Sequence, residues 1–448
     1  MSISGASLPA DDPRAILAEN RMRPLQCVAI AICFLLNALD GFDILAITFA
    51  APGIARDWGI GPGAVGTIVS MGLVGMVIGS LTLGQLADRI GRRRQILLCL
   101  AIIIPGMIAC AFATGVVMLS LLRAITGLGL GAMLAAINAM AAEFASRARR
   151  DLAVSIMAAG YPVGGIVGGW GAAQLLRHHG WESIFLFGGL ATALMVPLVL
   201  LFLPESIGWL ATRGGPDALA RINAILRRLG QPLAGRIAIL DEPKASMGAL
   251  FADRYRTMTI ALILMYGLHM MTFYYALGWA PSLVVALGFD PSRATIVSVA
   301  MNMGGAIGGV TLGLLSPRLG LRRLVLVGLA GAAIAVSIFG AVPADFLMLQ
   351  VAAFCLGFLA NGSVVGLYAL IANVYPTTLR ATGTGAVIGF GRFGAAFGPF
   401  IAGQLLAAGA GRGVTSMLLA FGSGLAALVL LLVQIRAAEE NGSQPKLA

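Results

Sequence analysis

Four charged side chains lie inside long apolar stretches of the sequence, where a charge is costly. Asp40 and Asp43 fall in the first such stretch, Arg123 in the fourth and Arg392 in the eleventh. Each costs about 2.5–3.5 kcal/mol at the centre of a membrane helix, so each must face a cavity or a partner. We therefore treat these four residues as the first candidates for a functional site.

Asp40 and Asp43 are three residues apart and share one face of a helix, with Asn37 one turn earlier. At 1.5 Å per residue, Asp40 lies roughly 22 Å above the inner boundary, and Arg123 roughly 10 Å below the outer one. In a core about 30 Å thick these depths nearly coincide. A carboxylate whose affinity for a proton changes as an Arg approaches or leaves is what proton coupling requires. The alternative is a structural pair that holds two helices together.

Arg392 lies near the middle of its stretch, and the expected spans of the second half contain no Asp or Glu. A guanidinium in a water-filled cavity suits bidentate binding of a carboxylate. The alternative is a structural Arg bound to backbone carbonyls. The seventh stretch contains two pairs of ring-bearing residues at helical spacing, His269 with Phe273 and Tyr275 with Trp279. These rings could stack on an aromatic ligand, or they could be ordinary packing residues. The candidate substrate-binding residues are Arg392, Asn37, His269, Phe273 and Tyr275.

The composition fixes the protein class. Of the 448 residues 59% are hydrophobic and 11% charged, against about 25% charged in a soluble domain. This excludes a soluble enzyme, a disordered chain and a secreted disulfide scaffold, and predicts a polytopic membrane protein. The five cysteines show no metal-ligand spacing and are expected to be packing residues, and no cofactor is expected. The twelve expected spans are 25–54, 62–86, 95–114, 116–142, 152–176, 183–203, 257–287, 294–316, 324–344, 346–372, 381–408 and 413–435.

The basic residues predict the topology. With a cytoplasmic N-terminus, cytoplasmic segments hold 24 of the 30 Lys and Arg and the opposite side holds four. We therefore expect a multi-pass protein of the cell (inner) membrane with both termini cytoplasmic. The net charge of +11 follows from this topology, so no nucleic-acid partner is expected. The long polar segment 204–256 is expected to be cytoplasmic, with a short amphipathic helix over 218–229.

An internal repeat divides the chain. GQLADRIGRRR (84–94) aligns with GLLSPRLGLRR (313–323), and each follows the second span of its half. The predicted fold is an all-α membrane protein of twelve transmembrane helices in two pseudo-symmetric six-helix halves. The expected parts are an N-terminal tail (1–24), two halves (25–203 and 257–435), the central loop (204–256) and a C-terminal tail (436–448).

These motifs resemble those of a known family. The run at 84–94 is similar to the loop signature of the major facilitator superfamily, and Arg123 with Gly127, Gly129 and Gly131 resembles its motif in the fourth span. LDGFDILAITFAAP (39–52) resembles the first-span signature of the aromatic acid:H⁺ symporters. The region 375–399, which includes Arg392, resembles the eleventh span of the same family.

The resemblance implies uptake of an aromatic carboxylic acid, such as a hydroxybenzoate, coupled to proton entry by alternating access. Asp40 and Asp43 would then be the essential acids, with Arg123 setting their proton affinity. The partners would be protons, a small organic anion and the lipid bilayer, and a monomer is expected. The resemblance also implies a cytoplasmic gating loop, made of Gly84, Asp88, Arg89, Gly91, Arg92 and Arg93.

Some features depart from these patterns. Pro317 replaces the acid in the second copy of the loop, so gating there must be asymmetric. PESIGWL (204–210) resembles a run found in sugar porters, but Gly208 replaces its Arg. A transporter of another organic acid and a proton-coupled drug or metabolite antiporter stay open as alternatives. A membrane-embedded enzyme is disfavoured, because the three histidines form no catalytic or metal cluster.

Overall fold

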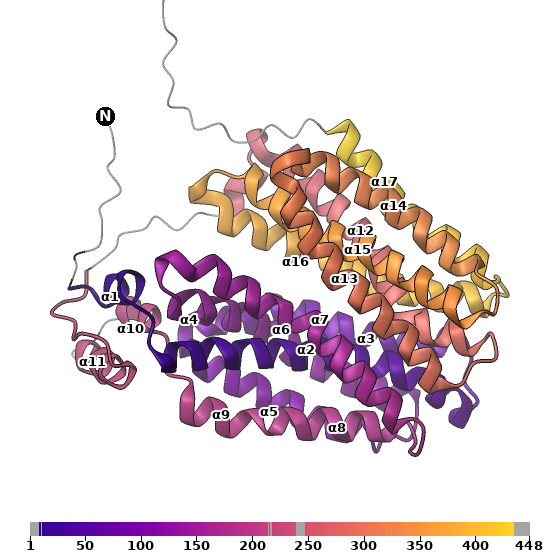
Figure 1. The fold of residues 1–448 in the computed structure, drawn as a ribbon, viewed down its shortest axis with the longest axis horizontal. Helices are drawn as coiled ribbons and strands as arrows, with labels where there is room; N and C mark the ends of the chain where they lie inside the picture. Colours follow the sequence, from indigo (N-terminus) through magenta and orange to yellow (C-terminus); the bar gives the residue numbers. More distant parts are fainter. Residues whose placement is uncertain (1–8, 10, 214, 216, 239–246, 434–448) are drawn as a thin grey trace, which may run out of the picture. The chain divides into compact units, whose positions relative to one another are not determined.

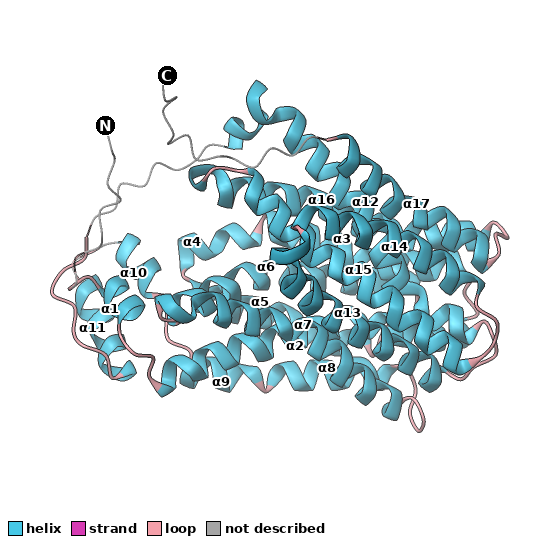
Figure 2. Cartoon of the chain, turned by 45° about the horizontal axis from the view of Figure 1, so that its top comes forward, coloured by secondary structure: helices cyan, strands magenta, loops and turns pink. Residues whose placement is uncertain are grey.

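A computed structural model describes residues 9, 11–213, 215, 217–238 and 247–433. Every regular element among them is a helix (Figure 2). Twelve helices are long and apolar enough to cross a membrane, which confirms the number of spans. They are α2 (Pro24–Trp58), α3 (Pro62–Leu81), α5 (Arg92–Cys110), α6 (Val116–Phe144), α7 (Arg150–Leu175), α8 (Glu182–Ala193) continued by α9 (Met195–Phe202), α12 (Asp253–Val285), α13 (Pro291–Leu319), α14 (Leu321–Ala341), α15 (Phe346–Val374), α16 (Thr377–Ala407) and α17 (Arg412–Leu432).

The sixth span is interrupted between α8 and α9, at Leu194. Pro197 has no N–H to donate to the carbonyl of Ala193, four residues earlier, so the helical ladder breaks at this point. Several helices also extend beyond their expected limits. α6, for example, runs to Phe144 and so includes Glu143, which lies just outside the expected span.

The chain forms two compact units. One consists of residues 1–242 with 278–302, and the other of 243–277 with 303–448. Figure 1 shows α2 to α9 of the first unit in indigo to magenta, and α14 to α17 of the second in orange to yellow. The predicted C-terminal tail, 436–448, lies outside the described residues.

Glycine contacts show the same helix packing in both units. In the first, Gly75 and Gly79 of α3 lie against backbone oxygens of α6, on Ala124 and Leu128. In the second, Gly304 and Gly308 of α13 lie against backbone oxygens of α15. A Cβ at any of these four glycines would overlap the opposite backbone. Each pair of helices therefore approaches through its glycines, at equivalent positions of the repeat.

Two arginines repeat the same capping interaction. Arg93, in the first copy of the loop motif, donates from Nη2 to Leu200 O at 2.6 Å, near the end of α9. Its counterpart Arg322 donates from Nη2 to Leu430 O at 2.9 Å and to Val433 O at 3.0 Å, at the end of α17. The last carbonyls of a helix lack intrahelical donors, and a guanidinium satisfies them. In each half, this arginine thus links the start of the third span to the end of the sixth.

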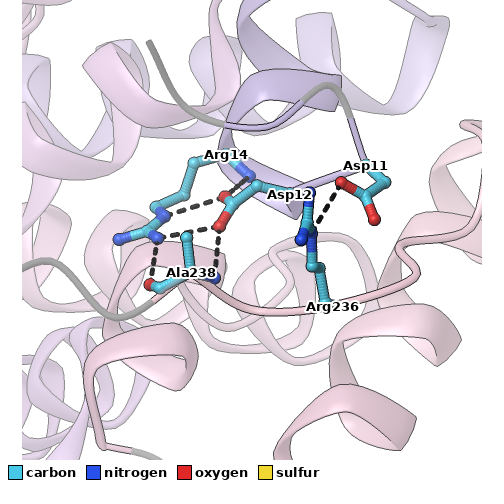
Figure 3. A network of polar contacts seen from close by, with 5 residues as sticks. All are labelled: Asp11, Asp12, Arg14, Arg236 and Ala238. Atoms are coloured by element: carbon cyan, nitrogen blue, oxygen red, sulfur yellow. Dashed lines mark hydrogen bonds and ion pairs between the residues drawn. The ribbon is translucent and has the colours of Figure 1, made fainter. Parts of the chain in front are cut away.

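A small cluster of helices lies beside the spans of the first unit: α1 (Pro13–Glu19), α10 (Ile207–Arg213) and α11 (Ala218–Leu229). α11 confirms the predicted amphipathic helix, and its Ile222, Leu226 and Leu229 are buried. Figure 3 shows how the N-terminal segment binds the central one: Asp12 accepts hydrogen bonds from the side chain of Arg14 and from the backbone N–H of Ala238. Folding of residues 11–20 is therefore coupled to that of the central segment.

Candidate functional site

Asp43 is the most enclosed acid of α2, with 1% of its surface exposed. Its Oδ2 accepts a hydrogen bond from Thr192 Oγ1 of α8, at 3.5 Å. Its Oδ1 has no hydrogen-bond partner among the described residues. Gly188 of α8 leaves space for this oxygen, because a Cβ there would lie 3.0 Å from it. An ionised Asp43 is thus sparsely solvated, and Oδ1 offers a position for a proton.

Arg123 of α6 is 2% exposed and lies against Asp43. Its Nη2 donates to the main-chain oxygen of Asp43 at 3.1 Å, and its Nη1 contacts Met107 Sδ of α5 at 3.5 Å. The two opposite charges are close enough to interact electrostatically. The structure therefore brings the first and fourth spans together at Asp43 and Arg123, with the hydrogen bond made to the backbone of Asp43.

Asn37 and Asp40 lie on the same helix and contact other neighbours. Asn37 is buried, and its Nδ2 donates to the carbonyls of Met157 at 2.8 Å and Ala158 at 3.3 Å in α7. Asp40 is also buried and lies close enough to Cys99 of α5 for its charge to act on that thiol. Asn37 therefore links α2 to α7, and its predicted contact with substrate stays a prediction.

The second unit holds the other candidates. His269 is fully buried, with Nε2 3.0 Å from Ala360 O and Nδ1 2.8 Å from Ser423 Oγ. A carbonyl only accepts, so Nε2 carries the proton and Nδ1 accepts from Ser423. The buried Tyr275 forms a hydroxyl–hydroxyl hydrogen bond of 2.6 Å with Ser416. These contacts link α12 to α15 and α17, and favour the packing alternative for His269 and Tyr275.

Phe273 and Arg392 are less enclosed than His269. Phe273 is half-buried and lies edge-on to Tyr274, with ring centroids 5.4 Å apart. Arg392 is also half-buried, on α16. Its charge is close enough to act on Tyr266 of α12, a residue that the sequence reading does not single out.

The predicted gating loop folds into short helical turns, η1 (Leu83–Leu86) with Gly84 and α4 (Ala87–Ile90) with Asp88 and Arg89. Arg92 Nη2 binds Asp88 Oδ1 at 3.0 Å. Gly91 has φ +102° and precedes α5. Only glycine adopts this conformation without strain, which explains the glycine between Asp88 and the arginines.

The predicted gating loop is bound by the segment that follows α9. Glu205 Oε1 accepts from Arg93 N at 2.9 Å, next to Gly91. The main-chain oxygen of Asp88 accepts from Trp209 Nε1 at 3.0 Å and from Arg213 Nη2 at 2.8 Å. These bonds attach the loop between the second and third spans to the beginning of the central segment.

A half-buried acid of α6 adds to this contact and is not among the residues that the sequence analysis singles out. Glu143, at the end of α6, accepts from Ser206 Oγ at 2.5 Å and from Gly208 N at 2.7 Å. Its hydrogen bonds to Ser206 and Gly208 make it part of the contact between α6 and the beginning of the central segment. The sequence feature that could have identified Glu143 is its position one residue beyond the expected span 116–142. In the structure it binds residues of the PESIGWL run.

The family is decided by a match over most of the chain. The model of the Major Facilitator Superfamily matches residues 33–290 and 262–447. The chain belongs to the Major Facilitator Superfamily. Its twelve apolar helices make it a multi-pass membrane protein of this superfamily.

Named relatives within the superfamily are transporters, not enzymes. The chain is 35% identical to the gallate transporter of Pseudomonas putida over 94% of this chain and 96% of that one. It is 32% identical to the 4-hydroxybenzoate transporter of Acinetobacter baylyi over 88% of each chain. The resemblance to aromatic acid transporters, first indicated by the motifs around Asp40 and Arg392, is confirmed.

Solved structures of the superfamily share the fold. The partially occluded inward-open conformation of the xylose transporter from E. coli matches with a TM-score of 0.72 and 16% identity, over 91% of this chain and 97% of that one. This likeness confirms the superfamily fold that the sequence predicts.

Proposed function

We propose that this protein takes up an aromatic carboxylic acid together with protons. The observation that carries the proposal is the buried Asp43 carboxylate beside Arg123, within a chain related to gallate and 4-hydroxybenzoate transporters. Membership of the superfamily and the named relatives support the transporter class, and the buried acid supplies a group that can exchange a proton. Asp40, one turn earlier, is a second acid for the same path.

The charges of this site favour coupled binding. With Asp43 ionised, the Asp43–Arg123 pair has no net charge. Protonation of Asp43 adds one positive charge to the four charges within the spans, which otherwise sum to zero, and a bound organic anion removes that excess. A neutral site costs less to enclose away from water than a charged one. The occluded state is therefore favoured when proton and anion are both bound, which is the requirement for symport.

The substrate carboxylate would bind Arg392, whose guanidinium presents a planar pair of donors. The half-buried Phe273 would contact the aromatic ring of the substrate. His269 and Tyr275 would keep the helices of this unit in register, because their polar atoms already bind neighbouring helices. Asn37 would do the same for α2 and α7 of the other unit.

The gating loop would open and close the cytoplasmic side. Asp88, Arg92 and Arg93 form contacts that can break while their own helices stay intact, since each bond joins separate segments or exposed side chains. We place the protein in the cell (inner) membrane with both termini in the cytoplasm, supported by the 24 of 30 basic residues on that side.

The experiment is uptake of radiolabelled gallate and 4-hydroxybenzoate into proteoliposomes with an inward proton gradient, imposed and then collapsed. Accumulation that follows the gradient is the expected result. The protonated acid can also diffuse through the lipid and accumulate in response to the gradient. Empty liposomes are therefore measured in parallel, and symport is the accumulation above that control. Expulsion of lipophilic cations driven by protons, with no accumulation of either acid, would show an exporter instead.

A further inference from the structure

We propose that Tyr368, oriented by Tyr266, donates a hydrogen bond to the substrate carboxylate beside Arg392. The proposal rests on the proposed function and adds a specificity-determining residue to it. The three residues lie on α15, α12 and α16 of one unit.

The first step is the close approach of α12 and α16. Gly267 of α12 lies against Gly391, since a Cβ at Gly267 would be 3.4 Å from Gly391 O, and a Cβ at Gly394 would overlap Gly267 O. The ring of Tyr266 occupies the space that a side chain at Gly391 would take. Tyr266 is therefore held next to the residue that precedes Arg392, and the Arg392 charge acts on it.

The second step is the pair of tyrosines. The hydroxyl oxygens of Tyr266 and Tyr368 are 3.2 Å apart, and their ring centroids are 5.9 Å apart. Tyr266 is 1% exposed, whereas Tyr368 is 37% exposed. Burying a hydroxyl proton without an acceptor is costly, so Tyr266 donates to Tyr368. The proton of Tyr368 is then left for an acceptor outside this pair, on the more exposed of the two tyrosines.

The third step is the chemistry that this arrangement recognises. A carboxylate has two oxygens and several lone pairs, so it can accept from a guanidinium and from a hydroxyl at once. Arg392 supplies the charge, and Tyr368 supplies a neutral donor of fixed direction. A hydrogen bond to an ionised acceptor is stronger than one between neutral groups. Loss of the Tyr368 hydroxyl should therefore weaken substrate binding while the fold is kept.

The test compares two probes, benzoate and 4-hydroxybenzoate, which differ only in the ring hydroxyl. Binding of each to purified full-length protein is measured by equilibrium dialysis, together with KM for uptake into proteoliposomes. Tyr368→Phe is expected to weaken binding of both probes by about tenfold and by the same factor. Tyr266→Phe, which removes a positioning hydroxyl, is expected to weaken both by about threefold.

A matched control removes another buried tyrosine hydroxyl from the same unit. Tyr375 binds Thr259 Oγ1 through its hydroxyl at 2.9 Å, beyond the end of α15. Tyr375→Phe should leave binding of both probes unchanged. The double variant Tyr368→Phe with Arg392→Gln gives a second criterion. If both groups bind the same carboxylate, the loss of binding free energy in the double variant differs from the sum of the two single losses.

Three outcomes would contradict the inference. If Tyr368→Phe weakens only 4-hydroxybenzoate, the tyrosine binds the ring hydroxyl and not the carboxylate. If it weakens neither probe while wild type binds both, Tyr368 has no part in recognition, and the proposed function stands without it. If wild type binds neither probe, the proposed function fails and this inference fails with it.

Discussion

Arg123 holds Asp43 by its backbone: Nη2 of Arg123 donates to the main-chain oxygen of Asp43 at 3.1 Å. The carboxylate of Asp43 accepts from Thr192 instead, at 3.5 Å. The guanidinium therefore keeps its anchor whether the carboxylate is ionised or protonated. This arrangement leaves Arg123 as a fixed positive charge beside an acid that can change state.

Asp43→Asn should abolish accumulation of aromatic acid driven by a proton gradient. The amide has nearly the same shape and cannot be protonated at neutral pH, so the site loses its exchangeable proton while the helix contacts remain. Gradient-driven uptake and counterflow of labelled 4-hydroxybenzoate in proteoliposomes are the measurements, with counterflow expected to persist. Asp57→Asn, at the exposed end of the same helix, is the matched control. Normal accumulation by Asp43→Asn would show that the coupling role is wrong.

Arg123→Lys should slow uptake by about tenfold or more, although it keeps the charge. A single ammonium group cannot reach both Asp43 O and Met107 Sδ, which two nitrogens of the guanidinium contact. The initial rate of uptake, normalised to reconstituted protein, measures this. Arg56→Lys, at the exposed end of α2, should have no effect. An unchanged rate in Arg123→Lys would mean that charge alone suffices at this position.

Gly91→Ala should destabilise the protein more than Gly320→Ala does. Both glycines have positive φ, +102° and +85°, with extended ψ, so each substitution carries a cost of about 1–3 kcal/mol for that conformation. At Gly91 the new Cβ would also lie 2.5 Å from Glu205 Oε2, whereas at Gly320 nothing lies within 4 Å. The thermal unfolding midpoints of the two purified variants give the comparison. Equal midpoints would contradict the close contact of Glu205 with the gating loop.

Asp12→Asn should release the N-terminal segment from the central one. Asp12 is fully buried and accepts bonds from Arg14 and Ala238 N, which favour its ionised form. Hydrogen exchange of residues 11–20 measures the opening, and at least a roughly tenfold faster exchange is expected. Asp11→Asn is the control, because its ion pair with Arg236 is exposed and contributes little. Equal exchange in the two variants would be evidence against this anchor.

The same contact should respond to pH. Burial alone would raise the pKa of Asp12, but the hydrogen bonds from Arg14 and Ala238 outweigh burial, and its pKa is lowered from 3.8. Stabilisation from a lowered carboxyl pKa is complete above the ordinary value and is lost as pH falls through the folded-state value. Exchange of residues 11–20, corrected for its intrinsic rate, should therefore stay constant from pH 7 to about 5 and rise below 3.8 in wild type. Asp12→Asn should show no such rise.

The positions of the spans could be predicted from sequence because burial in lipid requires long apolar stretches whatever their neighbours are. The same argument located Asp40, Asp43, Arg123 and Arg392, since a charge inside such a stretch stands out. The partners of these residues were harder to predict. Depth along a helix is fixed by its rise per residue, but the direction in which a side chain points depends on the packing of several helices.

His269 and Tyr266 illustrate this difference. Spacing on α12 selected His269, whose two ring nitrogens in the structure bind Ala360 and Ser423. Tyr266, three residues earlier, lies beside Arg392 only because Gly267 and Gly391 let α12 and α16 approach closely. No local sequence pattern shows that His269 binds neighbouring helices while Tyr266 lies beside Arg392, since both residues occupy apolar surroundings at helical spacing.

Composition and motifs local in the chain were enough to predict the membrane class, the number of spans, the internal repeat and the resemblance to aromatic acid transporters. The contacts of Arg123 with the backbone of Asp43, of Glu205 with Arg93, of Glu143 with Gly208 and of Tyr266 with Tyr368 appear only in the folded structure. Each of these contacts joins residues at least 65 positions apart, and their hydrogen bonds form only when close-packed segments bring them within reach.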